Sequence, residues 1–340
     1  MRRVIAAGLL MLATAATAVS AQRVEPIYHK AATIPMPDGR WDLLSVDPAH
    51  DRLMIGRADS VTLINLKTGG STSAGRIVRG HAAVAIEDTD LVAVTSGGDN
   101  SVRLINATTG QQTASIPVGE NPDAAFYEAA SKRLIVMNAR SGTVSIIDPR
   151  AARVTGTISV KPGLELGTLI APDMLAINNE DAGEIELVDL KRGAALAPIA
   201  LIGCNGPTGI AFDQTDELLL SACANGEAAL VDARSHRLIE LVAIGKGPDG
   251  ALFDPRRRRF MVPCGQSGSL SVFAVGRNRH LTSLGIVSTE VGARTAALDA
   301  RTGRIYLPAA SFAPAAVPNG RPTIVAGSVH VLVLEPSTTN

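Results

Sequence analysis

Apolar and polar positions alternate along this chain in a phrase that recurs roughly every 41 to 45 residues, a period typical of a β-propeller. Each copy is a short apolar run that a small polar cluster opens and an acidic residue closes, as in Pro122-Asp123-Ala124-Ala125-Phe126-Tyr127-Glu128. Other copies start at Trp41, Pro207, Pro248 and Ala293, with blurred ones at His81 and Leu164. We therefore count seven repeat units.

Each unit holds enough segments for four strands. In the third unit, short runs rich in Val, Ile and other apolar residues span 123–127, 133–137, 143–147 and 154–160, and Gly, Asn, Asp and Pro separate them. Such spacing leaves no room for helices. The pattern predicts an all-β, seven-bladed β-propeller of four-stranded antiparallel blades. The blades are expected at about 41–79, 80–121, 122–162, 163–206, 207–247, 248–292 and 293–335 plus 27–34.

The two ends of the chain indicate how the ring closes. The last unit supplies only three strands, near 295–298, 304–307 and 328–334. We expect 27–34 to pair as the outermost strand of this last blade, because closure removes edges that would otherwise invite aggregation.

A basic residue follows the closing acidic residue at a fixed spacing in four units. The pairs are Asp47 and Arg52, Glu128 and Arg133, Asp254 and Arg259, and Asp299 and Arg304. An acidic side chain before a hairpin turn can accept backbone N–H bonds, and the basic residue can pair with it across the strands. We predict structural ion pairs here.

The first residues have the layout of a secretory signal peptide. Arg2 and Arg3 precede an apolar stretch, and small residues end it near Ala21. We expect a signal peptide at 1–21, a single propeller domain at 22–340, and a periplasmic or secreted protein. The apolar stretch is too short for a stable bilayer span, so no transmembrane segment is expected.

Charge and aromatic content argue against nucleic-acid binding. The chain has 32 basic and 32 acidic residues, and aromatic residues make up only 3% of it. A neutral surface offers no general attraction for a polyanion, and stacking platforms for bases are scarce. We expect a monomer that binds an unidentified small ligand or protein partner.

The repeat resembles a known family at the residues quoted above. Pro-Asp leads the first strand, an acidic residue closes it, and Val118-Gly119 or Ile244-Gly245 ends the fourth strand. This pattern is similar to the YVTN-type β-propeller repeat of YncE-like exported proteins. The resemblance implies a propeller over the whole mature chain and names no reaction.

Equivalent positions of the repeat identify a candidate site. When the copies are aligned on their closing acidic position, the points around one mouth of the channel are Asp42, Ala82, Asp123, Glu165, Thr208, Asp249 and Arg294. Of the histidines, only His81 maps to this face. We predict a ligand site formed by Asp42, His81, Asp123, Glu165, Asp249 and Arg294. Alternatively, each Pro-Asp is a structural device that bonds its own turn.

Two functions are compatible with this mouth. One is a non-catalytic binding or scaffolding module for a small ligand, cation or partner. The other is a metal-dependent hydrolase of the lactonase type that uses the same carboxylates, an inference from fold analogy alone. An oxygen-rich cluster would suit calcium or magnesium as a divalent cation.

Three cysteines map to the same face. Hairpin register places Cys223 opposite Pro207 and hence near Cys204, so we predict a Cys204–Cys223 disulfide, as suits an exported protein. Cys264 is then left over, as a buried small residue, an alternative partner for Cys223 or one of three soft-metal ligands.

Two further segments have no assigned role. The run 256–259 is four arginines in a hairpin turn on the opposite face, which we interpret as a solvated turn or, alternatively, a contact for an anionic surface. The Pro- and Ala-rich loop at 309–327 is predicted to form a lid over the channel mouth.

Overall fold

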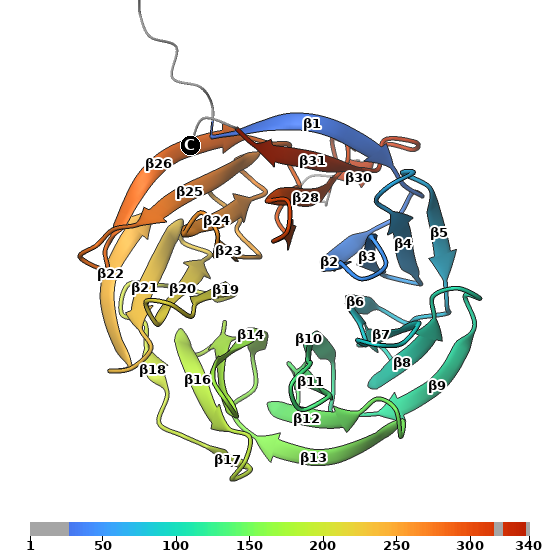
Figure 1. Ribbon diagram of the computed structural model, residues 1–340, viewed down its shortest axis with the longest axis horizontal. Coiled ribbons are helices and arrows are strands. Elements are labelled where there is room, and N and C mark those ends of the chain that lie inside the picture. The colour runs from blue at the N-terminus through green and yellow to red at the C-terminus, as the bar shows by residue number, and fades with distance from the viewer. Residues whose placement is uncertain (1–26, 316–321, 338–340) are drawn as a thin grey trace, which may run out of the picture.

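The computed structural model describes residues 27–315 and 322–337, and all regular elements within these ranges are β-strands. They form seven antiparallel blades around a central axis, and the chain visits the blades in order (Figure 1). This arrangement confirms the predicted all-β, seven-bladed propeller. The predicted signal peptide at 1–21 lies outside the described residues.

Each blade runs from its innermost to its outermost strand. Blade 1 contains β2 (Trp41–Asp47), β3 (Arg52–Arg57), β4 (Val61–Asn65) and β5 (Ser71–Ala74), and blade 2 contains β6 (Gly80–Ala85), β7 (Leu91–Ser96), β8 (Ser101–Asn106) and β9 (Gln112–Pro117). Blade 3 contains β10 (Pro122–Glu128), β11 (Arg133–Asn138), β12 (Thr143–Asp148) and β13 (Arg153–Ser159). In blade 4, β14 (Leu164–Ala171), β15 (Met174–Asn179) and β16 (Glu184–Asp189) are followed by a divided outer strand, β17 (Ala194–Ala195) and β18 (Ile199–Ala200).

The remaining blades follow the same plan. Blade 5 contains β19 (Pro207–Asp213), β20 (Leu218–Cys223), β21 (Glu227–Asp232) and β22 (Arg237–Ala243), and blade 6 contains β23 (Leu252–Asp254), β24 (Arg259–Cys264), β25 (Ser269–Val275) and β26 (Leu281–Ser288). Blade 7 contains β27 (Ala297–Asp299), β28 (Arg304–Ala309), β31 (His330–Pro336) and, outermost, β1 (Tyr28–Pro35).

The first and last strands of the chain close the ring. Strand β1 pairs antiparallel with β31, with Tyr28 opposite Pro336 and Pro35 opposite His330, as predicted for the N-terminal segment. Figure 1 shows the blue β1 lying along the red β31 at the rim. The Tyr28 side chain is 1% exposed and its hydroxyl donates to Met261 Sδ of blade 6 at 3.2 Å, so the closing strand is also anchored to the neighbouring blade.

Apolar side chains hold neighbouring blades together. The core consists of clusters that each straddle two adjacent blades, such as Ile135 and Met137 of blade 3 with Leu175 and Ile177 of blade 4. Clusters of this kind lie between every adjacent pair of the described blades, including blades 7 and 1. Each sheet therefore buries both faces against its neighbours, which explains why its middle strands are apolar throughout.

The predicted acidic and basic pairs form only in part. Arg52 lies 3.4 Å from Asp47 and Arg133 lies 2.6 Å from Glu128, as expected. In the other two blades the acidic residues pair with arginines inside the turn. Asp254 binds Arg257 at 2.8 Å and Asp299 binds Arg301 at 3.2 Å. In these two blades the acidic residue pairs with an arginine two or three residues later in the same turn, rather than with the predicted arginine on the next strand.

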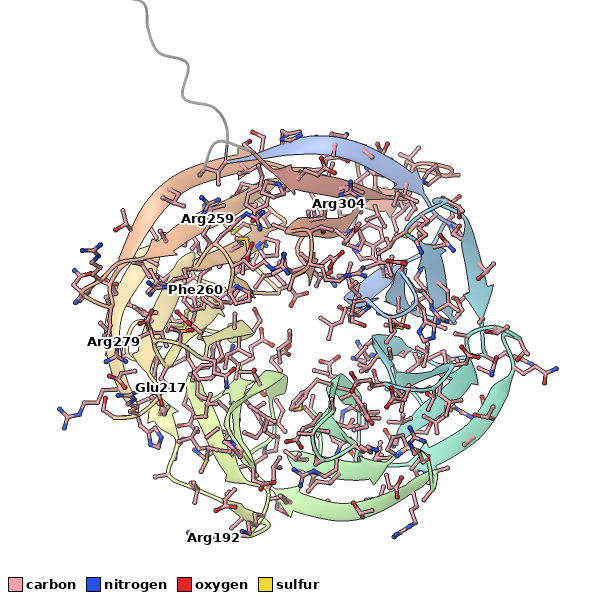
Figure 2. All side chains as sticks on the ribbon, in the orientation of Figure 1. Arg192, Glu217, Arg259, Phe260, Arg279 and Arg304 are labelled. Carbon is pink, nitrogen blue, oxygen red and sulfur yellow. A yellow bond between two sulfur atoms is a disulfide. The ribbon has the colours of Figure 1, made fainter. Side chains whose placement is uncertain are left out.

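The arginine run at 256–259 is not a simple solvated turn. Arg259 is 8% exposed in β24, Arg258 pairs with Asp216 of blade 5, and Arg256 donates to the carbonyl of Arg301 in blade 7 at 2.7 Å. Figure 2 shows Arg259 beside Phe260 within the blade, whereas Arg192 projects from the rim. The run therefore connects blade 6 to its two neighbours.

The described part of the 309–327 loop forms a small hairpin. Strand β29 (Phe312–Ala313) pairs with β30 (Thr323–Ile324), and the ring of Phe312 lies 6.4 Å from the ring of Trp41 at the start of β2. The N–H of Gly327 donates to Asp38 at 2.9 Å. The base of the loop is thus fixed beside blade 1, and the predicted lid remains a prediction because residues 316–321 lie outside the described residues.

Candidate functional site

The innermost strands bring one residue from each blade to the mouth of the channel. Strand pairing places Trp41 opposite Arg57, Pro122 opposite Asn138 and Pro207 opposite Cys223, with a bulge just after each of these first residues. A bulge adds one unpaired residue and turns its side chain away from the normal alternation. The residues at this point of the repeat form what we call the mouth ring: Asp42, His81, Asp123, Glu165 and Thr208 within the innermost strands, and Asp249 and Arg294 in the segments before β23 and β27.

The structure corrects the predicted alignment in blade 2. Gly80 pairs with Ser96 there, so His81 occupies the position that the sequence alignment gave to Ala82. The closing position is taken by Ile86, whose N–H donates to the carbonyl of Leu91 at 2.9 Å, and the acidic Glu87 comes one residue later. Aligning on the acidic residue therefore shifted this blade by one position.

Charged side chains of the mouth ring form one continuous chain across five blades. His81 Nδ1 lies 2.6 Å from Asp42 Oδ2 and 2.8 Å from Asp123 Oδ1. Arg294 Nη2 lies 3.5 Å from the other oxygen of Asp42, and Arg294 Nε donates to Asp249 Oδ2 at 2.5 Å. The order around the mouth is thus Asp249, Arg294, Asp42, His81 and Asp123. The structure brings together five of the six predicted site residues.

His81 is the centre of this chain. Burial alone lowers the pKa of an imidazolium, but the hydrogen bonds to Asp123 and Asp42 outweigh it and raise the pKa of His81 to about 9. Its side chain is only 12% exposed, so these ion pairs are poorly screened by solvent. At neutral pH His81 carries a proton that compensates two carboxylates.

Glu165, the sixth predicted site residue, forms no ion pair within the described residues. Burial and the nearby charges of Asp123 and Asp249 raise the pKa of Glu165 to about 9. Glu180, which the sequence analysis did not single out, contributes further repulsion. With a pKa of about 9, Glu165 is a neutral carboxylic acid at pH 7, beside carboxylates that are paired with His81 and Arg294.

Asp249 is a buried carboxyl group like Glu165, but it also has a cationic partner. Burial raises its pKa, the charge of Arg294 lowers it, and repulsion from Asp42 raises it again, giving a pKa of about 6. The Arg294 guanidinium is desolvated, but Asp249 and Asp42 together keep its pKa above the usual range. At neutral pH, three carboxylates, one imidazolium and one guanidinium leave the described mouth ring with a net negative charge.

Hydrogen bonds between blades fix the main chain that carries the ring. Thr295 Oγ1 donates to the carbonyl of Asp42 at 2.9 Å, and Thr95 Oγ1 donates to the carbonyl of Asp123 at 3.2 Å. Thr208, the seventh ring residue, donates to the carbonyl of Pro248 at 3.4 Å. These bonds link blade 7 to blade 1, blade 2 to blade 3 and blade 5 to blade 6, so the main chain at these points of the ring is fixed before any ligand binds.

Two glycines allow His81 to approach its neighbours. A Cβ atom on Gly56 of blade 1 would lie 1.8 Å from the His81 carbonyl oxygen, and a Cβ atom on Gly97 would lie 3.0 Å from His81 Nε2. Any side chain at Gly56 would therefore displace the His81 main chain. These glycines, together with Asn121 beside Gly97, are site residues that the sequence analysis missed, since glycine and asparagine in a loop ordinarily indicate only a turn.

The channel directly beneath the mouth ring is apolar. A cavity of about 110 Å³ is lined by the residues that follow the ring in the innermost strands, among them Leu43, Ala82, Ala124, Leu166 and Ala251. Small side chains at most of these positions leave the space open. A charged ring above a narrow apolar cavity suits a small ligand with a polar head and a short apolar part.

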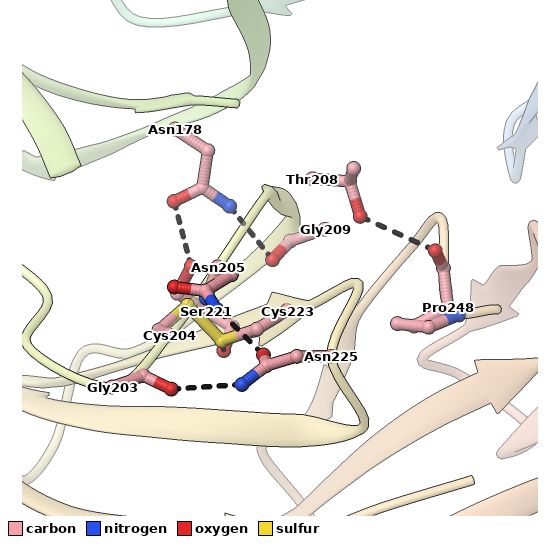
Figure 3. The surroundings of a disulfide bond; sticks show 10 residues. All are labelled: Asn178, Gly203, Cys204, Asn205, Thr208, Gly209, Ser221, Cys223, Asn225 and Pro248. Atoms are coloured by element: carbon pink, nitrogen blue, oxygen red, sulfur yellow. Dashed lines mark hydrogen bonds between the residues drawn. A yellow bond between two sulfur atoms is a disulfide. The ribbon is translucent and has the colours of Figure 1, made fainter. Parts of the chain in front are cut away.

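The predicted disulfide is present on the same face. Cys204 and Cys223 are joined, with their Cα atoms 5.3 Å apart, and Figure 3 shows the bond beside Asn205 and Asn225. Asn225 Nδ2 donates to the carbonyl of Gly203 at 2.9 Å, so the segment entering blade 5 is held twice. Cys264 is a free, fully buried residue at the equivalent place in blade 6, and burial raises the pKa of its thiol.

Comparison with known proteins identifies the fold and no activity. No family model matches the chain, and no curated protein matches it. A solved structure, "Crystal Structure of Mitotic Checkpoint Complex", contains a chain that is similar to this one with a TM-score of 0.70 at 14% identity, covering 94% of this chain and 98% of that chain. At this identity the likeness shows the propeller fold alone. In the described part of the chain there is also no helix of the length and hydropathy needed to cross a bilayer.

Proposed function

We propose that this protein is an exported binding or scaffolding propeller that holds a small ligand at its mouth ring. The observation that carries the proposal is the chain of ion pairs from Asp249 to Asp123 above the apolar cavity. Charges held in a partly buried opening by a rigid scaffold are typical of a recognition site. The net negative charge favours a ligand with a cationic head, such as a short alkylammonium ion.

Export is supported by the N-terminal sequence and by the disulfide. Arg2, Arg3 and the following apolar residues have the order of a signal peptide. The Cys204–Cys223 bond suits an oxidising compartment such as the periplasm or the cell exterior. The mass of the protein recovered after expression with its native N-terminus tests this proposal, since cleavage near Ala21 is expected. The resemblance to YncE-like proteins remains part of the same proposal.

A titration of the full mature chain with alkylammonium ions of increasing chain length tests ligand binding. We expect saturable binding, measured by calorimetry, that strengthens with chain length until the cavity is filled. Asp249→Asn should weaken this binding at least tenfold. Asp99→Asn is the matched control, because Asp99 lies in the β7–β8 turn of blade 2 and pairs with Ser101 and Arg103 outside the mouth ring. Absence of saturable binding, or equal affinity in the two variants, would overturn the proposal.

A second candidate function is a metal-assisted hydrolase of the lactonase type. It is favoured by the position of Glu165, because burial and the neighbouring carboxylates raise the pKa of Glu165 to about 9, as suits a general acid. Simple lactones and esters, assayed with and without added divalent metal, test this function. Turnover that Glu165→Gln abolishes would support it, and absence of turnover with every metal would end it.

A further inference from the structure

Three side chains of the mouth ring present ligand atoms to a common point. Asp42, His81 and Asp123 come from blades 1, 2 and 3, and one oxygen or nitrogen of each lies within 4.8 Å of the others. His81 Nδ1 is 2.6 Å from one carboxylate oxygen and 2.8 Å from the other. Ligand atoms about 2.1 Å from a tetrahedral metal ion are about 3.4 Å apart, so His81 Nδ1 and each carboxylate oxygen need to separate by about 0.6–0.8 Å to admit the ion.

We propose that Asp42, His81 and Asp123 bind one divalent first-row transition metal ion, such as Zn²⁺, Co²⁺ or Mn²⁺, between His81 Nδ1 and one oxygen of each carboxylate. This proposal deepens the proposed function and rests on the mouth ring being the binding site. It differs from the expectation of calcium or magnesium, because an imidazole nitrogen at the centre of the set favours transition metals over these hard cations.

An independent observation concerns the other nitrogen of the His81 ring. His81 Nε2 and Asn121 Oδ1 are both buried atoms without a hydrogen-bond partner. They face the same point above Gly97, since a Cβ atom there would lie 3.0 Å from Nε2 and 2.6 Å from Oδ1. A histidine that binds metal through one nitrogen almost always donates its other N–H to an oxygen. Asn121 Oδ1 is an acceptor without a partner on that side of the ring.

The surrounding charges also suit a metal ion. Arg294 contacts Asp42 Oδ1, which leaves Oδ2 directed toward His81. The main chain of Asp123 is fixed by Thr95, and the main chain of His81 is confined by Gly56. Two carboxylates and a neutral imidazole would compensate a dication. The side chains of Asp42 and Asp123 are 22% and 20% exposed, so water or a ligand atom can complete the coordination.

Metal binding to the full mature chain tests the proposal. The protein is first dialysed against chelator and then titrated separately with Zn²⁺, Co²⁺, Mn²⁺ and Ca²⁺ in calorimetry, and Co²⁺ binding is also followed by its visible absorption. We expect one equivalent of Zn²⁺ or Co²⁺ to bind, a Co²⁺ spectrum with d–d bands shifted by nitrogen ligation, and weaker binding of Ca²⁺.

Variants inside and outside the proposed site distinguish it from adventitious metal binding. His81→Gln and Asp123→Asn should each weaken Zn²⁺ binding at least tenfold and remove the shifted Co²⁺ bands. His50→Gln is the matched control, because His50 also contacts a carboxylate, Asp47 at 2.8 Å, on the opposite face. Circular dichroism of each variant verifies folding, and Asn121→Ala should weaken binding without abolishing it.

Absence of one-equivalent binding, or equal affinity in His81→Gln and His50→Gln, would overturn the metal site. The alkylammonium titration reports on the proposed function separately. If alkylammonium binding depends on Asp249 while no metal binds, the metal site fails and the binding function stands. If metal binds and no alkylammonium ion does, the metal site stands and the proposed binding of a cationic ligand fails.

Discussion

Asp42 on β2 and His81 on β6 occupy the same position in adjacent blades, and their side chains meet at 2.6 Å. A repeat normally places identical chemistry at equivalent positions, but here an acid and a base alternate around the mouth. Asp123 then repeats the acid on the other side of His81 at 2.8 Å. Alternation turns a ring that would be repulsive into a chain of ion pairs.

His81→Gln should destabilise the protein in a pH-dependent way. The pKa of His81 is raised from 6.5 to about 9, so its stabilising effect is fully present below pH 6.5 and is lost as the pH rises through 9. We expect the variant to lose about 1–3 kcal/mol of unfolding free energy at pH 6, as for buried polar groups left without their hydrogen-bond partner.

Urea unfolding of both proteins at pH 6 and pH 10 measures this difference. The gap between wild type and variant should shrink at the higher pH. His50→Gln is a suitable control because the His50 side chain is 39% exposed. A gap that stays constant with pH would contradict the assigned protonation of His81.

Glu165→Gln, in contrast to His81→Gln, should increase the free energy of unfolding at neutral pH. The pKa of Glu165 is raised from 4.5 to about 9, so the unfolded chain ionises this group above pH 4.5 while the folded chain cannot. Folding is therefore penalised increasingly between pH 4.5 and 9. The amide removes that penalty, which is at most about 3 kcal/mol at pH 7.

The melting temperature of Glu165→Gln relative to wild type gives the check. It should exceed the wild-type value at pH 7.5 and match it near pH 4. Glu180→Gln should raise the melting temperature less, since removing this neighbouring charge relieves only part of the repulsion on Glu165. A variant less stable than wild type at pH 7.5 would show that Glu165 has a stabilising partner.

The repeat made the fold predictable, because every blade buries the same kind of apolar strand and leaves the same kind of turn. Even the closure by β1 followed from counting strands, since the last unit lacked one. The site was predictable to the level of positions, as equivalent residues of a ring must lie together. Five of the predicted residues indeed form the ion-pair chain.

The pairing within the site was not predictable. The alignment in blade 2 used Glu87 as the closing acid, whereas Ile86 takes that position and moves His81 into the ring. A single sequence does not reveal such a shift, because the acidic residue used for the alignment, Glu87, is itself displaced by one position. The roles of Gly56 and Gly97 depend on contacts between blades, which local patterns do not encode.

Asp213→Asn should leave the free energy of unfolding unchanged or increase it, whereas the same change at Asp254, the equivalent residue of blade 6, should decrease it. Asp213 is 0% exposed and its Oδ2 has no partner, because blade 5 has Leu218 where blade 1 has Arg52. Burial raises the pKa of Asp213, so its ionised form is a cost that grows as the pH rises. An amide keeps the Oδ1 acceptor for the N–H of Thr215 without the charge.

Asp254→Asn is the comparison for this prediction. Asp254 is equally buried but binds Arg257 at 2.8 Å, so its replacement should cost about 1–3 kcal/mol. Chemical denaturation at pH 7.5 measures both variants. Equal losses in the two variants would show that Asp213 is compensated in a way the contacts do not indicate.

Removal of the Cys204–Cys223 disulfide should destabilise the protein by about 3 kcal/mol, the loss expected when a loop of this size is no longer closed in the unfolded chain. The two cysteines are 19 residues apart in sequence and both are buried. Cys264→Ala is a matched control, since Cys264 occupies the place in blade 6 that Cys223 has in blade 5 and is free.

Melting with and without reductant distinguishes the effect of the disulfide from that of the free Cys264. Wild type and Cys264→Ala should both melt at a lower temperature in reductant, whereas Cys204→Ala/Cys223→Ala should melt at the same temperature with and without it. Thiol titration adds a count: no reactive thiol in the folded protein, one after denaturation, and all three cysteines after denaturation with reductant. Insensitivity of wild type to reductant would mean that closing this loop contributes little, and the stability of blade 5 would then rest on its apolar contacts with blades 4 and 6.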